Sequence, residues 1–106
     1  MALTEFAQKS LQRDDKVRKT YSGKMDGSYG HLMISEQKLL FVKEEGFIRK
    51  NRSVTLNLLF EKVGEIKPTS RYELNIVESD GSKHSFVVDN IPITVVEKSI
   101  REMLKR

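Results

Sequence analysis

The sequence predicts one α+β domain, mainly β: a strongly bent, seven-stranded antiparallel barrel capped by a C-terminal helix, with a short N-terminal helix before it. Three observations predict this fold. A length of 106 residues suits a single hydrophobic core. Apolar and polar residues alternate through most of residues 17–88, as in strands with one wet face. Residues 93–106 change to helical spacing.

Composition bounds the class of protein. Hydrophobic residues make up 38% and charged residues 32% of the chain, which is polar for a folded domain but not disordered. The absence of cysteine excludes disulfides and thiolate metal sites and suits a reducing cytoplasm. The first residues show no signal peptide, and the longest apolar run, residues 39–42, is far short of the roughly 20 that span a bilayer. We expect a soluble, cytoplasmic protein.

The N-terminal segment favours a short helix over residues 3–11. Thr4 is suited to cap its first turn, and Glu5 lies near its positive end. The polar residues 12–16 extend this helix or link it to the next element. We therefore divide the chain into a helix with its linker, residues 1–16, and a domain of residues 17–106. The apolar face of the helix consists of Leu3, Phe6, Ala7 and Leu11.

Two hairpins follow. Residues 17–25 alternate as a strand that ends at the turn pair Asp26-Gly27. Residues 29–43 contain two apolar segments around the polar tetrad 35–38, which predicts a hairpin. Its buried residues are Leu32 and Ile34, facing Leu39 and Phe41.

The middle of the chain combines turn, loop and strand patterns. Residues 43–46 indicate a turn, Phe47 and Ile48 a brief continuation of the sheet, and residues 49–52 a basic loop. Val54, Leu56 and Leu58 then alternate in a strand. Residues 59–66 also fit a helical period, but we favour a turn followed by a strand at 63–67, which Pro68 ends.

The last third predicts a hairpin and a helix. Residues 72–78 alternate with Tyr72, Leu74 and Ile76 on one face, and after a turn at 79–82 the return strand 83–88 points Phe86 and Val88 inward. The final helix begins with Pro92 in its first turn or with a capping box of Thr94 and Glu97. Its apolar stripe is Ile93, Val96, Ile100, Met103 and Leu104. We expect the last four of these to pack against Leu32, Phe41, Leu74 and Phe86.

These patterns resemble the pleckstrin-homology-like (PH-like) superfamily, especially its small bacterial PH and GRAM-type members. Their hairpin motif is matched by Gly30, Leu32, Ile34, Ser35, Lys38, Leu39 and Phe41, and the later hairpin and terminal helix are also similar. The resemblance covers residues 17–104 and implies a PH-like barrel. Residues 54–63 fit the family spacing only with one inserted residue, which leaves the register of the middle strands open.

No catalytic constellation stands out. The histidines, His31 and His84, lie on separate predicted strands, and we expect surface or half-buried side chains rather than metal ligands. The carboxylate pairs at 14–15 and 44–45 lie in polar segments, where nothing raises a pKa for acid–base work. Because there is also no nucleophile elbow or phosphate loop, we expect a protein that is not an enzyme and needs neither metal nor cofactor.

Binding is therefore the expected function. A protein partner or a homo-oligomer is favoured, through an open strand edge or the N-terminal helix. The first alternative is an anionic membrane surface, because the resemblance to phosphoinositide-binding PH domains implies that basic loop residues converge on headgroup phosphates. The second is nucleic acid, drawn by a net charge of +4, although acids sit among the bases almost everywhere. The candidate headgroup residues are Lys24, Lys43, Arg49, Lys50 and Arg52.

Overall fold

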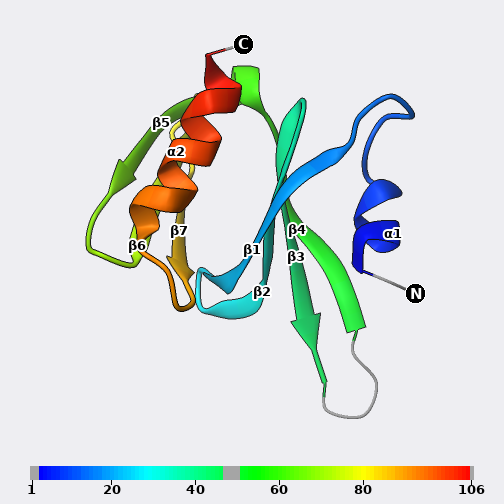
Figure 1. Ribbon diagram of the computed structural model, residues 1–106, viewed down its shortest axis with the longest axis horizontal. Helices are drawn as coiled ribbons and strands as arrows, with labels where there is room; N and C mark the ends of the chain where they lie inside the picture. The colour runs from blue at the N-terminus through cyan, green and yellow to red at the C-terminus, as the bar shows by residue number, and fades with distance from the viewer. Residues whose placement is uncertain (1–2, 47–50, 106) are drawn as a thin grey trace.

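The computed structural model describes residues 3–46 and 51–105, with the side chains of residues 3–5 outside the description. Within these described residues, one short helix, seven strands, a single 3-10 turn and a longer helix follow one another (Figure 1). In order they are α1 (Leu3–Gln8), β1 (Val17–Met25), β2 (Ser28–Ser35), β3 (Lys38–Glu45), β4 (Asn51–Leu59), η1 (Phe60–Lys62), β5 (Val63–Pro68), β6 (Glu73–Glu78), β7 (Lys83–Val88) and α2 (Ile93–Leu104).

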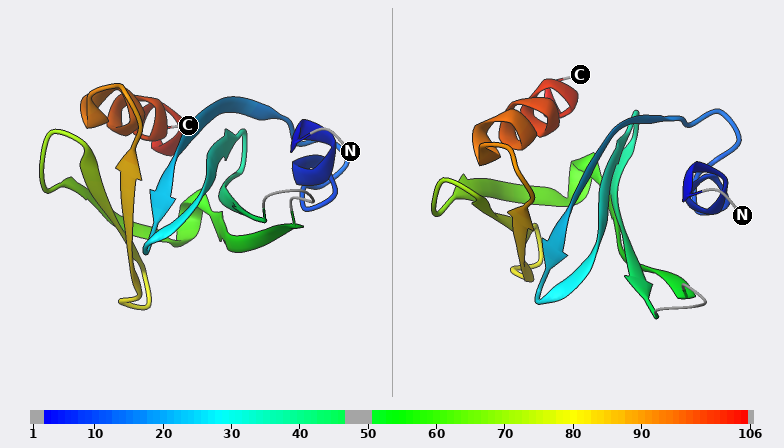
Figure 2. Two further views of the ribbon diagram at one scale, coloured as in Figure 1. Left: turned by 90° about the horizontal axis from the view of Figure 1, so that it is seen from below. Right: turned by 60° about the horizontal axis from the view of Figure 1, so that its bottom comes forward.

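The strands form one antiparallel sheet in the order β4-β3-β2-β1-β7-β6-β5. The sheet is bent so that β1–β4 and β5–β7 form two walls, with α2 lying against one side and α1 standing on the other (Figures 1 and 2). No ladder joins β4 to β5, so the sheet is barrel-like but not closed. The predicted α+β, mainly β class with seven antiparallel strands is confirmed.

The first two hairpins agree with the sequence. Asp26 and Gly27 have φ angles of 51° and 86°, the positive values that a two-residue hairpin turn requires at both central positions. In the β2–β3 ladder, Leu32 lies opposite Phe41, and Ile34 lies opposite Leu39. All four of these apolar side chains are buried, as predicted.

Residues 43–46 do not form the predicted turn. β3 continues to Glu45, which pairs with Asn51, so the predicted basic loop is also wrong at Arg52, which lies in β4 opposite Glu44. Charged residues are accommodated in these strands because Glu44 forms an ion pair with Arg52, and Lys43 forms one with Glu45. The predictions for Phe47, Ile48, Arg49 and Lys50 lie outside the described residues.

Residues 59–66, which fit both a helical period and a turn followed by a strand, form the end of β4, η1 and the first part of β5. The favoured interpretation, a turn followed by a strand, is therefore confirmed. The helical period of these residues reflects only the one 3-10 turn. The register of β4 shifts beside Phe41 and Val42, which pair with Leu56 and Val54 and leave Thr55 as an extra, unpaired residue. Tyr72 is a correction: it precedes β6 and is exposed rather than on the inward face.

The main core lies between the sheet and α2. The predicted contact between the helix stripe and the sheet is confirmed, because all eight residues belong to one apolar cluster. The capping box does not form: Pro92 is the N-cap, and Glu97 pairs with Arg101 four residues later. The fully buried members of this cluster include Leu32, Phe41, Leu74, Phe86, Val96 and Ile100, while Met103 and Leu104 are partly buried.

Asp15 is buried, although it lies in a polar linker that the sequence places in solvent. One carboxylate oxygen accepts hydrogen bonds from the backbone N–H groups of Lys16 and Glu36, at 2.8 and 2.9 Å. The other accepts one from the Ser35 hydroxyl at 2.8 Å. The carboxylate therefore fastens the linker to the turn between β2 and β3.

Replacing Asp15 with alanine is expected to lower the free energy of unfolding by about 1–3 kcal/mol, because it leaves the buried donors without an acceptor. Asp15→Asn is expected to be intermediate, since only one of its two terminal atoms accepts hydrogen bonds. Urea titration measures both changes. Asp14→Ala, at the exposed neighbour, is the control, and an equal loss in that variant would contradict the assignment.

Candidate functional site

Three of the predicted headgroup residues, Lys24, Lys43 and Arg52, lie in the described part of the chain, and these three do not share one face of the sheet. Lys43 pairs with Gly30, which in turn pairs with Gly23, and the two glycines of this row face the core rings of Phe41 and Phe86. Successive side chains of a strand point to opposite faces. Lys24 and Arg52 therefore point to the outer face at the same end of the sheet, and Lys43 points to the other face. Arg49 and Lys50 lie outside the described residues.

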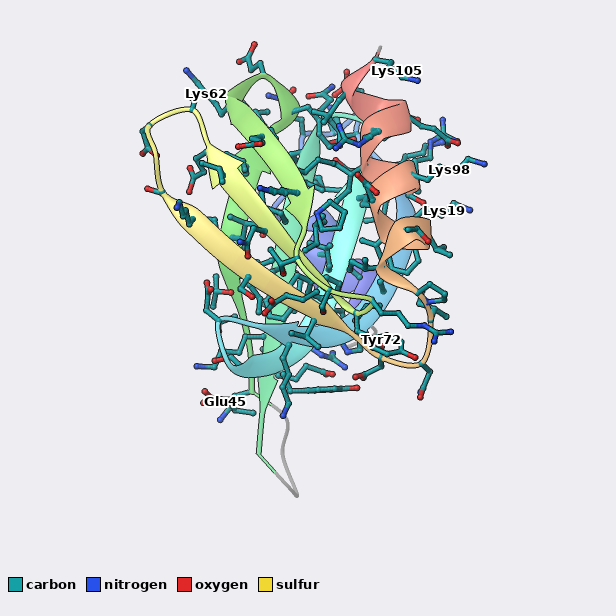
Figure 3. All side chains as sticks on the ribbon, turned by 90° about the vertical axis from the view of Figure 1, so that its left-hand side faces the viewer. Lys19, Glu45, Lys62, Tyr72, Lys98 and Lys105 are labelled. Carbon is teal, nitrogen blue, oxygen red and sulfur yellow. The ribbon has the colours of Figure 1, made fainter. Side chains whose placement is uncertain are left out.

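Other exposed lysines are dispersed over the surface. Lys19, Lys98 and Lys105 extend outward along the side that carries α2, and Lys62 is the last residue of η1 (Figure 3). All four are remote from Glu45, which marks the end of the sheet where Lys43 lies (Figure 3). The positive charge of the described part of the chain is thus spread out rather than focused.

Glu44 organises a polar network on the outer face that the sequence did not reveal. Its side chain is only 8% exposed, and its two oxygens contact His31 Nε2 at 2.6 Å and Arg52 Nε at 2.9 Å. The other ring nitrogen of His31 lies 3.2 Å from the hydroxyl of Ser22. The network joins β1, β2, β3 and β4, and only their register places its members side by side.

The Ser22–His31–Glu44 chain has the order of an acyl-transfer triad, but its surroundings do not suit that chemistry. Ser22 lies in the middle of β1, half-buried, rather than on a sharp turn that would present its hydroxyl to a substrate. The hollows beside β4, η1 and α2 are lined by other residues. We interpret the network as a fastening between strands.

His84 is similarly enclosed by carboxylates. Its Nε2 lies 2.7 Å from Glu78, and its Nδ1 lies 3.4 Å from Asp26, whose other oxygen accepts a hydrogen bond from the backbone N–H of Ser85. Both histidines are half-buried, as predicted. Among residues 3–46 and 51–105, no three metal-ligating side chains are arranged to hold an ion.

Glu73, on the outer face of β6, makes the stability of the fold depend on pH. The hydroxyl groups of Thr69 and Ser85 donate hydrogen bonds to its carboxylate, at 2.6 and 2.8 Å respectively. These bonds, the one from Thr69 more than the one from Ser85, lower the pKa of Glu73 from its ordinary value of 4.5. Because the folded-state pKa is the lower one, the linked stability is present above pH 4.5 and is lost as the pH falls through the folded pKa.

We expect Thr69→Ala to raise the pKa of Glu73 toward 4.5, and by more than Ser85→Ala does, because the Thr69 bond is the larger cause. Carboxyl chemical shifts recorded across an NMR titration report this pKa directly. A pKa that is unchanged in both variants would contradict the assignment.

The two edges of the open sheet differ sharply. β5 is short and carries the protective features of natural edges: a register shift beside Gly64, the charged residues Glu65 and Lys67, and Pro68 at its end. Arg101 of α2 also donates a hydrogen bond to the carbonyl oxygen of Ile66 at 3.1 Å. This edge is therefore shielded from another strand.

β4 is the exposed edge. It runs for nine residues without proline, and its single charged side chain, Arg52, is engaged by Glu44. Its C-terminal half borders a hollow of about 370 Å³. The residues lining this hollow are Asn57, Leu58, Leu59, Lys62, Glu78, Ser79 and Asp80.

The hollow offers both signs of charge beside the strand edge. The backbone N–H of Ser82 donates a hydrogen bond to Asp80 at 2.9 Å, which lowers the pKa of Asp80 from 3.8 and keeps it ionised near neutral pH. Lys62 lies on the same rim. The sequence carried no signal for this site, because residues 57–59 and 78–80 meet only through the bend of the sheet.

Two further hollows lie near the C-terminal end of α2. A cavity of about 130 Å³ lies between β1 and the helix, lined by Lys19 and Met103 among others, and the Tyr21 hydroxyl contacts that of Ser99 at 2.6 Å. A hollow of about 400 Å³ lies where Met103 meets η1. The hollow of about 400 Å³ reaches only Leu59, the last residue of β4, whereas the hollow of about 370 Å³ borders residues 57–59 of that strand.

In the part of the chain that the structure describes, no helix has the length and apolar character needed to cross a membrane. Comparison of the sequence with protein-family models and with curated proteins gives no match.

Proposed function

We propose that this chain is a non-enzymatic, PH-like binding module that recognises a protein partner by adding an extended segment of it to the free edge of β4. One observation carries the proposal: among the described residues, this nine-residue edge has no neighbouring strand on its free side, and it opens into a hollow with both signs of charge. An unpaired edge supplies main-chain hydrogen bonds, and flanking side chains select the sequence that binds. The proposed setting is the cytoplasm, which suits a chain without cysteine.

The direction of the backbone in β4 identifies the groups that face the partner. Phe60 N–H donates to the carbonyl oxygen of Gln37, so this residue points its backbone toward β3. Backbone direction alternates along an antiparallel strand, and the register is regular from Lys38–Leu59 to Phe41–Leu56. The N–H of Asn57 therefore points to the free edge, where the added segment pairs.

This geometry allows a test that spares the fold. Proline at position 57 removes the outward N–H without removing a β3–β4 hydrogen bond, and edge strands tolerate proline at such positions. Asn57→Ala is the matched control, because it removes the same side chain but keeps the N–H. The probes are random linear peptides displayed on phage, selected on the immobilised full chain and then synthesised.

We expect selected peptides to bind the native chain and Asn57→Ala equally, and Asn57→Pro about tenfold more weakly, the equivalent of one main-chain hydrogen bond of about 1.4 kcal/mol. The amide of Asn57 is expected to gain protection from hydrogen exchange on binding. Failure to select any peptide, or peptides that bind Asn57→Pro normally, would overturn strand addition at β4.

A second candidate is peripheral binding to anionic lipid headgroups, as the PH-like and GRAM-like resemblance implies. The observation that favours it is the position of Lys24 and Arg52 on one face and at one end of the sheet, beside Tyr29, which is 44% exposed. A tyrosine with an apolar body and a polar tip suits a membrane interface. Against it, Arg52 and Lys43 already contact carboxylates.

Sedimentation with phosphatidylserine vesicles tests this second candidate. If it holds, Lys24→Glu lowers binding strongly, whereas Lys98→Glu, a change of equal charge on α2, lowers it little. An equal loss in both variants would indicate unspecific attraction by net charge, and the same pair of variants tests nucleic acid with a random oligonucleotide.

A further inference from the structure

The outer face of the sheet carries a second apolar cluster that the main core does not need. Met33, Leu40 and Val42 point away from α2 and are at most 1% exposed. The outer side of an antiparallel sheet normally meets water and is polar. Here it is apolar over β2 and β3, and Val54 of β4 extends it.

Helix α1 covers this face. It stands on the opposite side of the sheet from α2 (Figures 1 and 2), and Ala7 is completely buried against the cluster while Phe6 packs beside it. A small residue next to an aromatic one lets a helix approach the sheet closely. The cluster is thus a helix-binding face, and the chain's own α1 shows the chemistry that fits it.

The attachment of α1 is mostly apolar. Among the described residues, one polar contact joins residues 6–11 to the sheet: the Lys38 ammonium donates to the carbonyl oxygen of Ser10 at 3.3 Å. A helix of six residues does not hold its shape alone in water, so α1 depends on this face. The buried Asp15 fastens the chain to the sheet after the helix. Gln8 of α1 also donates a hydrogen bond from Nε2 to the carbonyl oxygen of Asp15 at 2.8 Å, so one polar contact ties the helix to this anchored linker.

The face is also larger than the surface that α1 covers. Val17 and Val54 at its borders remain half-buried, as do Phe6 and Leu11. A helix longer than α1 would remove more apolar area from water, at roughly 25 cal/mol for each Å².

We propose that the face formed by Met33, Leu40, Val42 and Val54 binds an amphipathic helix of a partner protein, and that α1 occupies this site in its absence. This surface is distinct from the free edge of β4 and does not depend on the strand-addition proposal. The partner helix presents a small residue beside an aromatic one, as Ala7 and Phe6 do, and continues for further turns over Val17 and Val54.

A second copy of this chain is the weaker occupant. Its α1 would make the same contacts as the resident helix, without the effective concentration, of the order of mM, that a short linker provides. A longer partner helix overcomes that advantage through the extra apolar area it buries.

The test displaces α1 within the full chain. Ala7→Asp places a carboxylate where the side chain is completely buried, and Gln12→Asp adds the same charge at an exposed position of the linker. The probe is a synthetic peptide that repeats the Phe-Ala pattern of residues 6–7 at helical spacing and is longer than α1. Fluorescence anisotropy measures its binding to the native chain and to both variants.

We expect Ala7→Asp to unfold cooperatively and to bind the probe at least about tenfold more tightly than the native chain or Gln12→Asp, because the competing helix is displaced. Equal binding by all three proteins would overturn the proposal. So would a native chain that elutes as a dimer dissociated by Ala7→Asp, since the occupant would then be a second copy.

Hydrogen exchange on the native chain decides the outcome if Ala7→Asp does not fold. The amides of α1 are expected to exchange through local opening, much faster than those of Met33 and Leu40 in the sheet. Exchange of α1 only through global unfolding, at the rate of the sheet, would show that the helix does not leave and would overturn the proposal.

Discussion

Truncation of Phe86 to alanine is expected to lower the free energy of unfolding by about 3–5 kcal/mol. The side chain is completely buried at the centre of the main core, and its ring meets that of Phe41 edge to face, with centroids 6.2 Å apart. Gly23 lies directly beneath the ring and has no side chain that could fill the space. The cavity therefore stays open, and the full cost of lost contacts is expected.

Urea unfolding monitored by circular dichroism measures this loss. Val87→Ala is the matched control: it lies next to Phe86 on β7 but is 40% exposed, and it is expected to change stability by less than about 1 kcal/mol. A loss below about 1 kcal/mol for Phe86→Ala would show that the core collapses around the ring site and would contradict the packing described above.

Gly30→Ala is expected to destabilise the fold by about 3 kcal/mol or more, the upper end of the range for overpacked sites. A Cβ at this position would lie 2.2 Å from the carbonyl oxygen of Val42 and 2.9 Å from the Cα of Lys43. Both atoms belong to the backbone of β3, so no change of rotamer relieves the overlap. Gly30 pairs with Gly23, and together they allow β1 and β2 to bend sharply beneath the two phenylalanine rings.

Thermal and urea unfolding compare this variant with Gly64→Ala, whose Cβ would come no closer than 3.2 Å to its nearest neighbour. That control is expected to lose less than about 1 kcal/mol. The double variant Gly30→Ala with Phe41→Leu is expected to recover nothing, because the nearest atom is a carbonyl oxygen rather than the ring. Recovery in the double variant would instead place the strain in the side-chain packing.

The hairpins were predictable because their signals are local. Period-two alternation located β1, β2, β6 and β7, and Asp26-Gly27 identified a turn whose geometry only a few residue pairs adopt. Residues 43–46 were misread because a run of charged residues indicates a turn unless its partners are known. The carboxylate of Glu44 meets His31 and Arg52 from two other strands, and such pairing is not visible along the chain.

The candidate site was less predictable than the fold. Lys24 and Lys43 were grouped with the predicted basic loop that contains Arg52 because the resemblance to PH domains implies that such residues converge, but the register sends Lys43 to the opposite face. The free edge of β4 carried no residue signal at all. An edge is defined by the absence of a neighbour in the sheet, which is a property of strand order and not of composition.

The sequence by itself determined the number and sequence limits of most strands, the apolar stripe of α2 and the residues of the main core, since these follow from local spacing and turn chemistry. Only the tertiary structure decided that Asp15 is buried, that α1 covers an apolar outer face, and that β4 rather than β5 presents an open edge. The physical reason is common to all three. Each depends on which strand lies beside which, and long-range pairing leaves no periodic trace in the chain.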